Sequence, residues 1–218
     1  MKSLISPSHW WRALKREWLI YHLGLPEFRF MFDAPPPNEW VSLDCETTGL
    51  NVSADEIISI GAVRIVGNKI MTSERFEVLV RPERGVSADS VRIHRLRGQD
   101  VAQGLPVDEA MKQLMHFIGS RPLVGYFLEF DVAMLNRAIW PLLGQGLPQP
   151  KIEVSAMYYD HKFRQMLPYE QQTNPNIDLR FATLMSDLDL PVREAHDALN
   201  DAVMAAMAFI KLRQLRGS

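Results

Sequence analysis

The segment WVSLDCETTGL, residues 40–50, is the part of the sequence on which the interpretation of the rest depends. Side chains alternate faces along a strand, so Asp44 and Glu46 point to the same side while the apolar side chains between them point to the other. Two like charges about 4 Å apart repel by roughly 4 kcal/mol at an effective dielectric near 20. A proton, a basic partner or a divalent cation has to offset that repulsion, and oxygen ligands favour Mg, Mn or Ca.

Composition limits the class of protein but does not identify its function. The chain has 218 residues, 47% of them hydrophobic, and a net charge of −2, which predicts a folded chain without a global polyanion-binding surface. With this acid content, D-x-E is expected about 0.8 times by chance, so the pair alone is weak. The single cysteine, Cys45, shares the apolar face of its strand and is expected to be a core residue rather than a reactive thiol. With no signal peptide or long apolar run, the sequence predicts a cytoplasmic protein.

Residues 1–37 are predicted to form a separate N-terminal segment that precedes a domain spanning residues 38–218. Apolar side chains at three- and four-residue steps predict an amphipathic helix that ends near Gly24, followed by a proline-rich connector. One interpretation is a docking helix for a partner protein or membrane surface, anchored by Trp11 and Trp18. The favoured interpretation is packing against the rest of the same chain, with a variant that begins at Asn38 keeping the activity of the domain.

The pattern of the remaining sequence predicts three consecutive strands and then alternating helices and strands. Gly67-Asn68 is a two-residue signature of a tight hairpin between the second and third strands. Such an order favours a mixed sheet. After the opening strand, the predicted strands are 56–66, 69–80, 122–127 and 151–154, and the predicted helices are 107–119, 131–142, 177–188 and 197–215.

Further acids stand near the ends of these elements. Asp131 follows an apolar strand, and its alternative interpretation is a helix N-cap. In HDALND, residues 196–201, a helix starting near Asp197 would be capped by that residue and would carry Asp201 one turn further along. His196 stands at the entrance to this helix. Taken singly, His196 would be a surface histidine and Asp201 an ordinary helix carboxylate.

Together these motifs resemble the DEDDh exonucleases, the family that includes the proofreading epsilon subunit of bacterial DNA polymerase III. The resemblance rests on DCETTGL at 44–50, FD at 130–131 and HDALND at 196–201, and it covers residues 38 to about 212. It implies an RNase H-like α/β fold with a five-stranded mixed sheet flanked by helices. It also implies a 3′–5′ exonuclease that releases nucleoside 5′-monophosphates from a nucleic acid 3′ end.

The resemblance assigns roles to particular residues. It implies that two divalent cations, Mg or Mn, are held by four carboxylates and that His196 is the general base, for which a histidine's ordinary pKa near 6.5 is suitable. It places the terminal nucleotide against the TTGL segment, with Thr48 and Leu50 as the expected contacts. The four implied metal ligands are Asp44, Glu46, Asp131 and Asp201.

One departure from the family pattern concerns substrate choice. Tyr126 and Phe127 stand where many relatives carry a His-Asn pair, so contacts near the substrate are expected to differ. The stretch 81–97 carries five arginines and is either a phosphate-binding patch or a solvated helix face. The sequence favours DNA as substrate but leaves two alternatives open: an exoribonuclease that trims RNA 3′ ends, and a non-catalytic module that binds a polymerase or nucleic acid.

Overall fold

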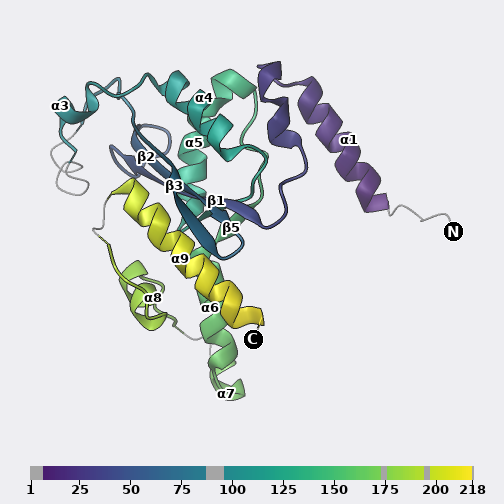
Figure 1. Cartoon of the computed structure of the whole chain (residues 1–218), viewed down its shortest axis with the longest axis vertical. Coiled ribbons are helices and arrows are strands. Elements are labelled where there is room, and N and C mark those ends of the chain that lie inside the picture. The colour runs from purple at the N-terminus through teal and green to yellow at the C-terminus, as the bar shows by residue number, and fades with distance from the viewer. Residues whose placement is uncertain (1–6, 87–95, 173–175, 194–196, 218) are drawn as a thin grey trace.

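A central mixed sheet with helices on both faces forms the body of the protein (Figure 1). The computed structural model describes residues 7–86, 96–172, 176–193 and 197–217. The first three strands form an antiparallel meander, and the last two join it in parallel with β1. The sheet order is β3-β2-β1-β4-β5, for strands β1 (Glu39–Thr47), β2 (Ile57–Val66), β3 (Lys69–Leu79), β4 (Leu123–Gly125) and β5 (Lys151–Glu153).

The predicted strands and hairpin are confirmed. Val66 pairs with Lys69 across the predicted turn, and Gly67 has φ +61°, a left-handed conformation that glycine adopts without steric cost. The predicted five-stranded mixed sheet is therefore present. Strands β4 and β5 have three residues each, and α5 (Leu128–Leu143) and α6 (Val154–Gln165) follow them in the chain.

Several helices differ from the prediction: α8 begins at Phe181, four residues after its predicted start, and η1 and α3 were not predicted. α5 begins at Leu128, three residues before the predicted start, and α6 and α7 were not predicted. Among the described residues, no helix combines the length and apolar character that crossing a membrane requires. The helices are α1 (Pro7–Tyr21), η1 (Pro26–Phe32), α3 (Gly98–Val101), α4 (Val107–Ile118), α5 (Leu128–Leu143), α6 (Val154–Gln165), α7 (Pro168–Gln171), α8 (Phe181–Asp187) and α9 (Ala198–Gly217).

The alternation of β1 divides the core into two layers. Val41, Leu43 and Cys45 are buried on the face that η1, α4 and α5 cover. The opposite face packs against α6, α8 and α9, as Val63 and Val124 do. Cys45 is buried in the first layer, which confirms its interpretation as a core residue. Asp44 and Glu46 therefore face the layer that contains α9.

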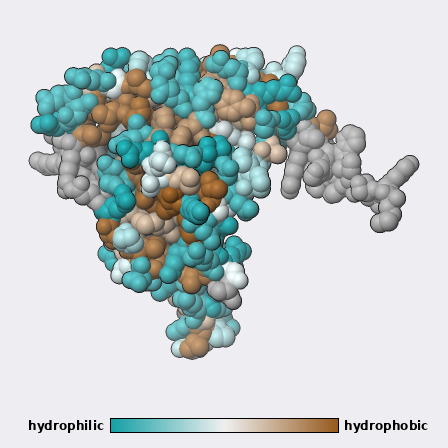
Figure 2. All heavy atoms as spheres, in the orientation of Figure 1, coloured by the Kyte–Doolittle hydropathy of each residue, from teal (hydrophilic) through white to brown (hydrophobic). Residues whose placement is uncertain are grey.

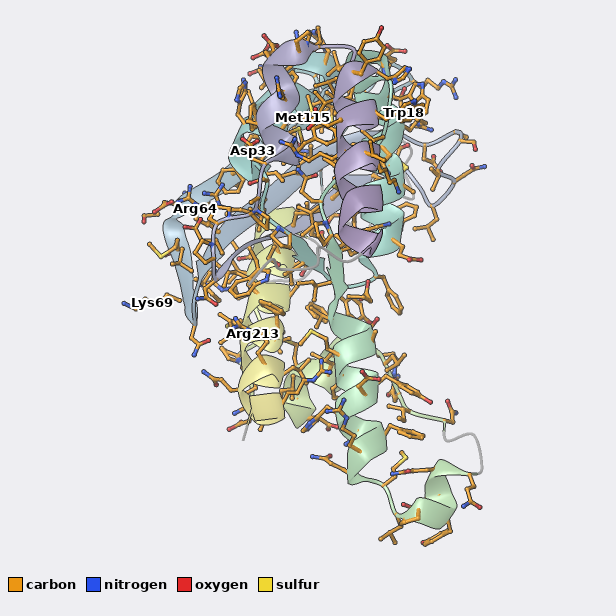
Figure 3. All side chains as sticks on the ribbon, turned by 90° about the vertical axis from the view of Figure 1, so that its right-hand side faces the viewer. Trp18, Asp33, Arg64, Lys69, Met115 and Arg213 are labelled. Carbon is orange, nitrogen blue, oxygen red and sulfur yellow. The ribbon has the colours of Figure 1, made fainter. Side chains whose placement is uncertain are left out.

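The N-terminal segment packs on the rest of the chain along one side of α1. Leu19 and Ile20 contact the core cluster there, and Arg16 donates a hydrogen bond to the carbonyl of Phe32 at 2.7 Å. Phe28, Met31 and Phe32 of η1 are buried in the same layer as β1, so this turn is continuous with the core. By contrast, the exposed fraction of Trp18 is 59% and that of Tyr21 is 85%. In Figure 3, Trp18 and Asp33 lie on opposite sides of α1. The side chain of Trp11, the second predicted anchor, lies outside the described part of the chain.

Candidate functional site

Three carboxylates converge where β1 ends. Asp44 and Glu46 project from β1, and Asp201 projects from the first turn of α9. One oxygen of each carboxylate lies within 4.8 Å of the oxygens of the other two. All three side chains are half-buried, so this charge is concentrated at a place that water reaches only in part. The arrangement offers a divalent cation several oxygen ligands at once.

A glycine in β2 allows α9 to approach the sheet closely enough to place Asp201. Gly61 is the register partner of Asp44, and a Cβ atom at position 61 would lie 2.1 Å from the backbone nitrogen of Leu199. The hydroxyl of Ser42 also donates a hydrogen bond to the carbonyl of Ala202 at 2.8 Å. The role of Gly61 was not predicted from the sequence. Its signal is a lone glycine inside an apolar strand, which often marks a close approach of another backbone.

Asp131 reaches the same region from the other layer of the structure. Its Oδ1 accepts a hydrogen bond from the backbone nitrogen of Cys45 at 3.1 Å, between the two acids of β1. Asp131 lies inside the first turn of α5, whose N-cap is Phe127, so the alternative interpretation of Asp131 as the N-cap is wrong. Its side chain is buried, and it lies outside the group of three oxygens described above.

Glu153 holds the start of α5 in place, a role that the sequence analysis did not identify. Phe127 has φ +52° and makes no side-chain cap. The carboxylate of Glu153 instead accepts hydrogen bonds from the backbone nitrogens of Phe127 and Leu128, both at 2.8 Å. It thus does the work of an N-cap for the helix that carries Asp131. The available signal was an acid at the end of a predicted strand next to the one that precedes Asp131.

Burial and mutual repulsion raise the pKa values of these acids. Burial, followed by the charges of Asp131, Asp201 and then Glu46, raises the pKa of Asp44 well above its ordinary value. Burial and then the charge of Asp201 raise the pKa of Glu46 to about 7. Burial is also the main cause that raises the pKa of Asp131 to about 8, against the lowering effect of the hydrogen bond from Cys45. Bound divalent cations would favour the ionised forms, so the residues present fit a metal site.

His196 lies outside the described residues, so its predicted role is not placed by the structure. Its neighbour Asp197 accepts a hydrogen bond at Oδ1 from the backbone nitrogen of Asn200 at 2.9 Å. This bond is the N-cap geometry predicted for Asp197, since the acceptor lies three residues before the donor. Asp201, rather than Asp197, belongs to the three-oxygen group.

The loop after β1 is held by hydrogen bonds that leave Leu50 exposed. The hydroxyl of Thr48 donates to Oδ1 of Asp55 at 3.1 Å, and the backbone nitrogen of Asn51 donates to Oδ2 at 2.8 Å. The guanidinium of Arg137 donates to the carbonyls of Val52 and Asp55. The Thr48 hydroxyl therefore stabilises the loop, whereas the exposed fraction of Leu50 is 86%.

The predicted basic patch is partly engaged in contacts within the chain. Arg97 forms an ion pair with Asp100 at 3.2 Å. Arg84 donates a hydrogen bond to the carbonyl of Ala54 at 3.3 Å. Arg92 and Arg95 lie outside the described residues. The choice between a phosphate-binding patch and a solvated face stays open.

Comparisons with known proteins give the family of the chain. The family model described as exonuclease (RNase T) matches residues 41–209. A DNA polymerase III PolC-type protein of Thermotoga maritima is 26% identical over 81% of this chain and 12% of its own length. A DNA polymerase III subunit epsilon-like protein of Rhodobacter capsulatus is 29% identical over 79% and 23%. The DNA polymerase III subunit epsilon of Aquifex aeolicus is 27% identical, with 79% of both chains covered.

Solved structures support the fold. The zinc-bound complex of E. coli exonuclease I with single-stranded DNA aligns with a TM-score of 0.67 at 16% identity, over 83% of this chain and 41% of that chain. Exonuclease X in complex with 5′-overhanging duplex DNA aligns with a TM-score of 0.59 at 23% identity, over 82% and 93%. The five-stranded mixed sheet and its flanking helices match these RNase H-like enzymes. The family model covers more than three quarters of the sequence, and the chain therefore belongs to the exonuclease family.

Proposed function

We propose that this protein is a metal-dependent 3′–5′ exonuclease that hydrolyses terminal phosphodiesters of DNA and releases nucleoside 5′-monophosphates. The observation that carries the proposal is the convergence of oxygens from Asp44, Glu46 and Asp201 within 4.8 Å of one another. An uncompensated cluster of this kind would lower the stability of the fold, because like charges repel strongly where water is partly excluded. Divalent cations relieve that repulsion and supply hydrolytic chemistry at the same place.

The carboxylates are proposed to hold two ions, Mg or Mn. Asp44, Glu46 and Asp201 face one another directly, and Asp131 stands on the other side of β1 with its Oδ1 against Cys45. Oxygen-only donors favour such hard cations over softer metals. When bound, two such ions favour formation of a nucleophile from water and stabilise charge on the attacking and leaving oxygens. The carboxylates fix where the scissile phosphate can sit.

His196 is proposed as the general base, and Thr48 and Leu50 as the residues beside the terminal nucleotide. The capping bond of Asp197 fixes the start of α9, the helix that carries Asp201, and His196 directly precedes Asp197 in the sequence. A histidine accepts a proton near neutral pH, which suits deprotonation of a water molecule. Leu50 is exposed on a loop that hydrogen bonds hold in place, so it can contact a base without rearrangement.

DNA is proposed as the preferred substrate because the relatives named above are DNA polymerase III proteins. Trimming of RNA 3′ ends is the alternative for the same site, and the matched substrates described below distinguish the two. The exposed face of α1 is proposed as a contact for a partner protein. The lone, buried Cys45 has no disulfide, which supports a proposed cytoplasmic location.

Digestion of matched DNA and RNA oligonucleotides tests this function. Each oligonucleotide is labelled at the 5′ end in one reaction and at the 3′ end in another, with Mg²⁺, Mn²⁺ or EDTA. The proposal predicts that 3′-labelled DNA releases labelled mononucleotide first, that 5′-labelled DNA shortens progressively, and that EDTA stops both. Faster RNA digestion would favour the exoribonuclease alternative. Binding without hydrolysis under all metal conditions would contradict the proposed activity and favour a non-catalytic module.

A further inference from the structure

A hollow of about 290 Å³ opens beside the carboxylates on the α8 and α9 side of the sheet. Asp44 and Asp201 form one side of it, so it is continuous with the acidic site. Aromatic and aliphatic side chains form the rest, and Figure 2 shows hydrophobic atoms at the surface in the region of α8. The hollow is lined by Asp44, Tyr126, Phe181, Ala182, Met185, Val192, Asp201 and Met204.

The aromatic part of the hollow is fixed before any ligand binds. The rings of Tyr126 and Phe181 are stacked, with centroids 4.4 Å apart and planes inclined by 27°. The hydroxyl of Tyr126 donates a hydrogen bond to the carbonyl of Leu179 at 2.6 Å, which anchors that ring to the segment before α8. Tyr126 belongs to the aromatic pair that replaces the His-Asn pair of many relatives. Its polar atom therefore contacts the protein rather than the site.

The chemistry of the lining selects the kind of group that can enter. Met185 and Met204 are buried and provide an adaptable apolar wall, and none of the described residues lining the hollow is basic. Bound cations would attract a phosphate to the edge formed by Asp44 and Asp201, but the rest of the described lining offers a phosphate no cationic side chain. The volume lies at the lower end of the roughly 300–1,000 Å³ range of small-molecule pockets, so it admits one planar ring system and little more.

We propose that this hollow is a subsite for one nucleobase of the substrate strand, bound by stacking and apolar contact. The inference rests on the proposed function, because the carboxylates at its edge are the groups that would position the scissile phosphate. The base is therefore that of a nucleotide next to the bond that is cut. Every base has a flat π-face, so a subsite of this composition accepts all four bases.

The test asks whether the effect of removing one base of the substrate depends on the aromatic ring of Phe181. Single-stranded DNA carries an abasic residue at either the terminal or the penultimate 3′ position, and kcat/KM is compared with that of the intact strand. A base that stacks in the hollow predicts a loss of roughly 5- to 150-fold at one of the two positions. In Phe181→Ala, and in Phe181→Leu, which keeps apolar volume without a ring, that loss falls to within about twofold.

A matched control is Phe163→Ala. Phe163 is also half-buried and stacked on a tyrosine, Tyr159, with centroids 6.0 Å apart, but it lies in α6 outside the lining of the hollow. This variant keeps the wild-type sensitivity to the abasic residue. Thermal unfolding of every variant confirms that the chain is folded. An abasic penalty that is absent in the wild type, or equal in wild type and both Phe181 variants, would overturn the proposal.

A binding measurement separates this inference from the proposed function. The full chain is titrated, in Ca²⁺, with an oligonucleotide that carries 2-aminopurine at the sensitive position, since stacking on an aromatic ring quenches its fluorescence. Quenching that is lost in Phe181→Leu supports the subsite even in a protein that never hydrolyses DNA. Hydrolysis together with unchanged quenching in Phe181→Leu refutes the subsite and leaves the proposed function intact.

Discussion

The end of β1 and the 3-10 helix η1 affect the stability of the fold in opposite directions. At the end of β1, Asp44 and Glu46 are half-buried together with Asp201, and their pKa values are raised because ionisation there is unfavourable. In η1, Phe28, Met31 and Phe32 are buried in the apolar cluster beside α4 and carry no charge. Burial of apolar groups stabilises the fold, whereas burial of like charges destabilises it.

The two regions separate activity from stability in this chain. The like charges at the end of β1 destabilise the fold, and a bound cation can neutralise them. The residues that lower stability are therefore the same residues that the proposed activity requires. The 3-10 helix η1 packs against α4 and belongs to the apolar layer on the face of β1 away from Asp44 and Glu46. Substitutions in the two regions are therefore expected to affect different measurements: turnover in the first region and the unfolding midpoint in the second.

The largest effect on turnover is expected from removal of a metal ligand. In Asp44→Asn or Asp201→Asn, a site that supplies several kcal/mol of charge stabilisation is weakened, and kcat/KM should fall by about 10⁴-fold. The unfolding midpoint without metal should stay level or rise, because one repelling charge is gone. Steady-state hydrolysis of labelled DNA and thermal unfolding measure the two quantities.

Asp160→Asn is the matched control for these variants. It removes one carboxylate from an exposed position of α6 and should leave both turnover and stability unchanged. Wild-type turnover in Asp44→Asn or Asp201→Asn would show that these carboxylates contribute no more to activity than a carboxylate on an ordinary charged surface.

A smaller loss is expected from removal of the proposed base. His196→Ala should lower kcat by roughly 10²- to 10⁴-fold, the usual contribution of a general base. Because a histidine base must be unprotonated, the acidic limb of the pH–rate profile should disappear in the variant. Metal affinity, followed by calorimetric titration with Mn²⁺, should change little. If Asp197→Ala harms turnover more than His196→Ala, the assignment of roles within HDALND is wrong.

Glu153 is expected to affect both turnover and stability, because it supports the helix that carries Asp131 without touching the cluster of three oxygens. In Glu153→Ala, α5 loses its capping carboxylate, which costs about 1 kcal/mol and lowers the unfolding midpoint by roughly 2–4 °C. Turnover should fall about tenfold as Asp131 loosens. Glu153→Gln keeps one acceptor oxygen and should recover part of both losses, whereas equal loss in the two variants would argue against a positioning role.

The smallest effect on turnover is expected from N-terminal truncation. A variant that begins at Leu23 loses only α1 and should keep wild-type kcat and most of its stability. A variant that begins at Asn38 also loses Phe28, Met31 and Phe32, worth roughly 5–9 kcal/mol of burial, which approaches the whole stability of a typical domain. Unfolding midpoints of the two variants check this. Equal midpoints would show that η1 contributes nothing to the core.

Sequence reasoning reached the acidic site because its signals are local. The alternation that places Asp44 and Glu46 on one face needs only a strand, and the cap at Asp197 needs only a helix start, as the bond to Asn200 shows. Both follow from backbone geometry within a few residues. The hairpin at Gly67 is of the same kind.

The parts that could not be read depend on contacts between distant segments. The sequence shows that Glu153 is an acid at the end of a predicted strand, but it does not show that Glu153 caps a helix beginning 25 residues earlier. The burial of Phe28 and Phe32 is likewise hard to predict, because η1 is a 3-10 helix of only seven residues, too short for a repeating apolar pattern to stand out. The pairing of Tyr126 with Phe181 joins two elements that only the folded sheet brings together. Tertiary packing, rather than local propensity, decides these features.

The most direct test of the central claim is the unfolding midpoint of the chain with and without Mn²⁺ between pH 5 and pH 8. Burial raises the pKa of Glu46 from 4.5 to about 7 and that of Asp131 from 3.8 to about 8, so over this range the folded chain keeps protons that the unfolded chain has released. Unfolding free energy without metal therefore falls as the pH rises. We predict a midpoint that drops from pH 5 to pH 8, a rise on adding Mn²⁺ that is largest at pH 8, and loss of most of that rise in Asp44→Asn. A midpoint at pH 8 that Mn²⁺ leaves unchanged, or raises equally in Asp44→Asn, would contradict the claim that these carboxylates form a cation site.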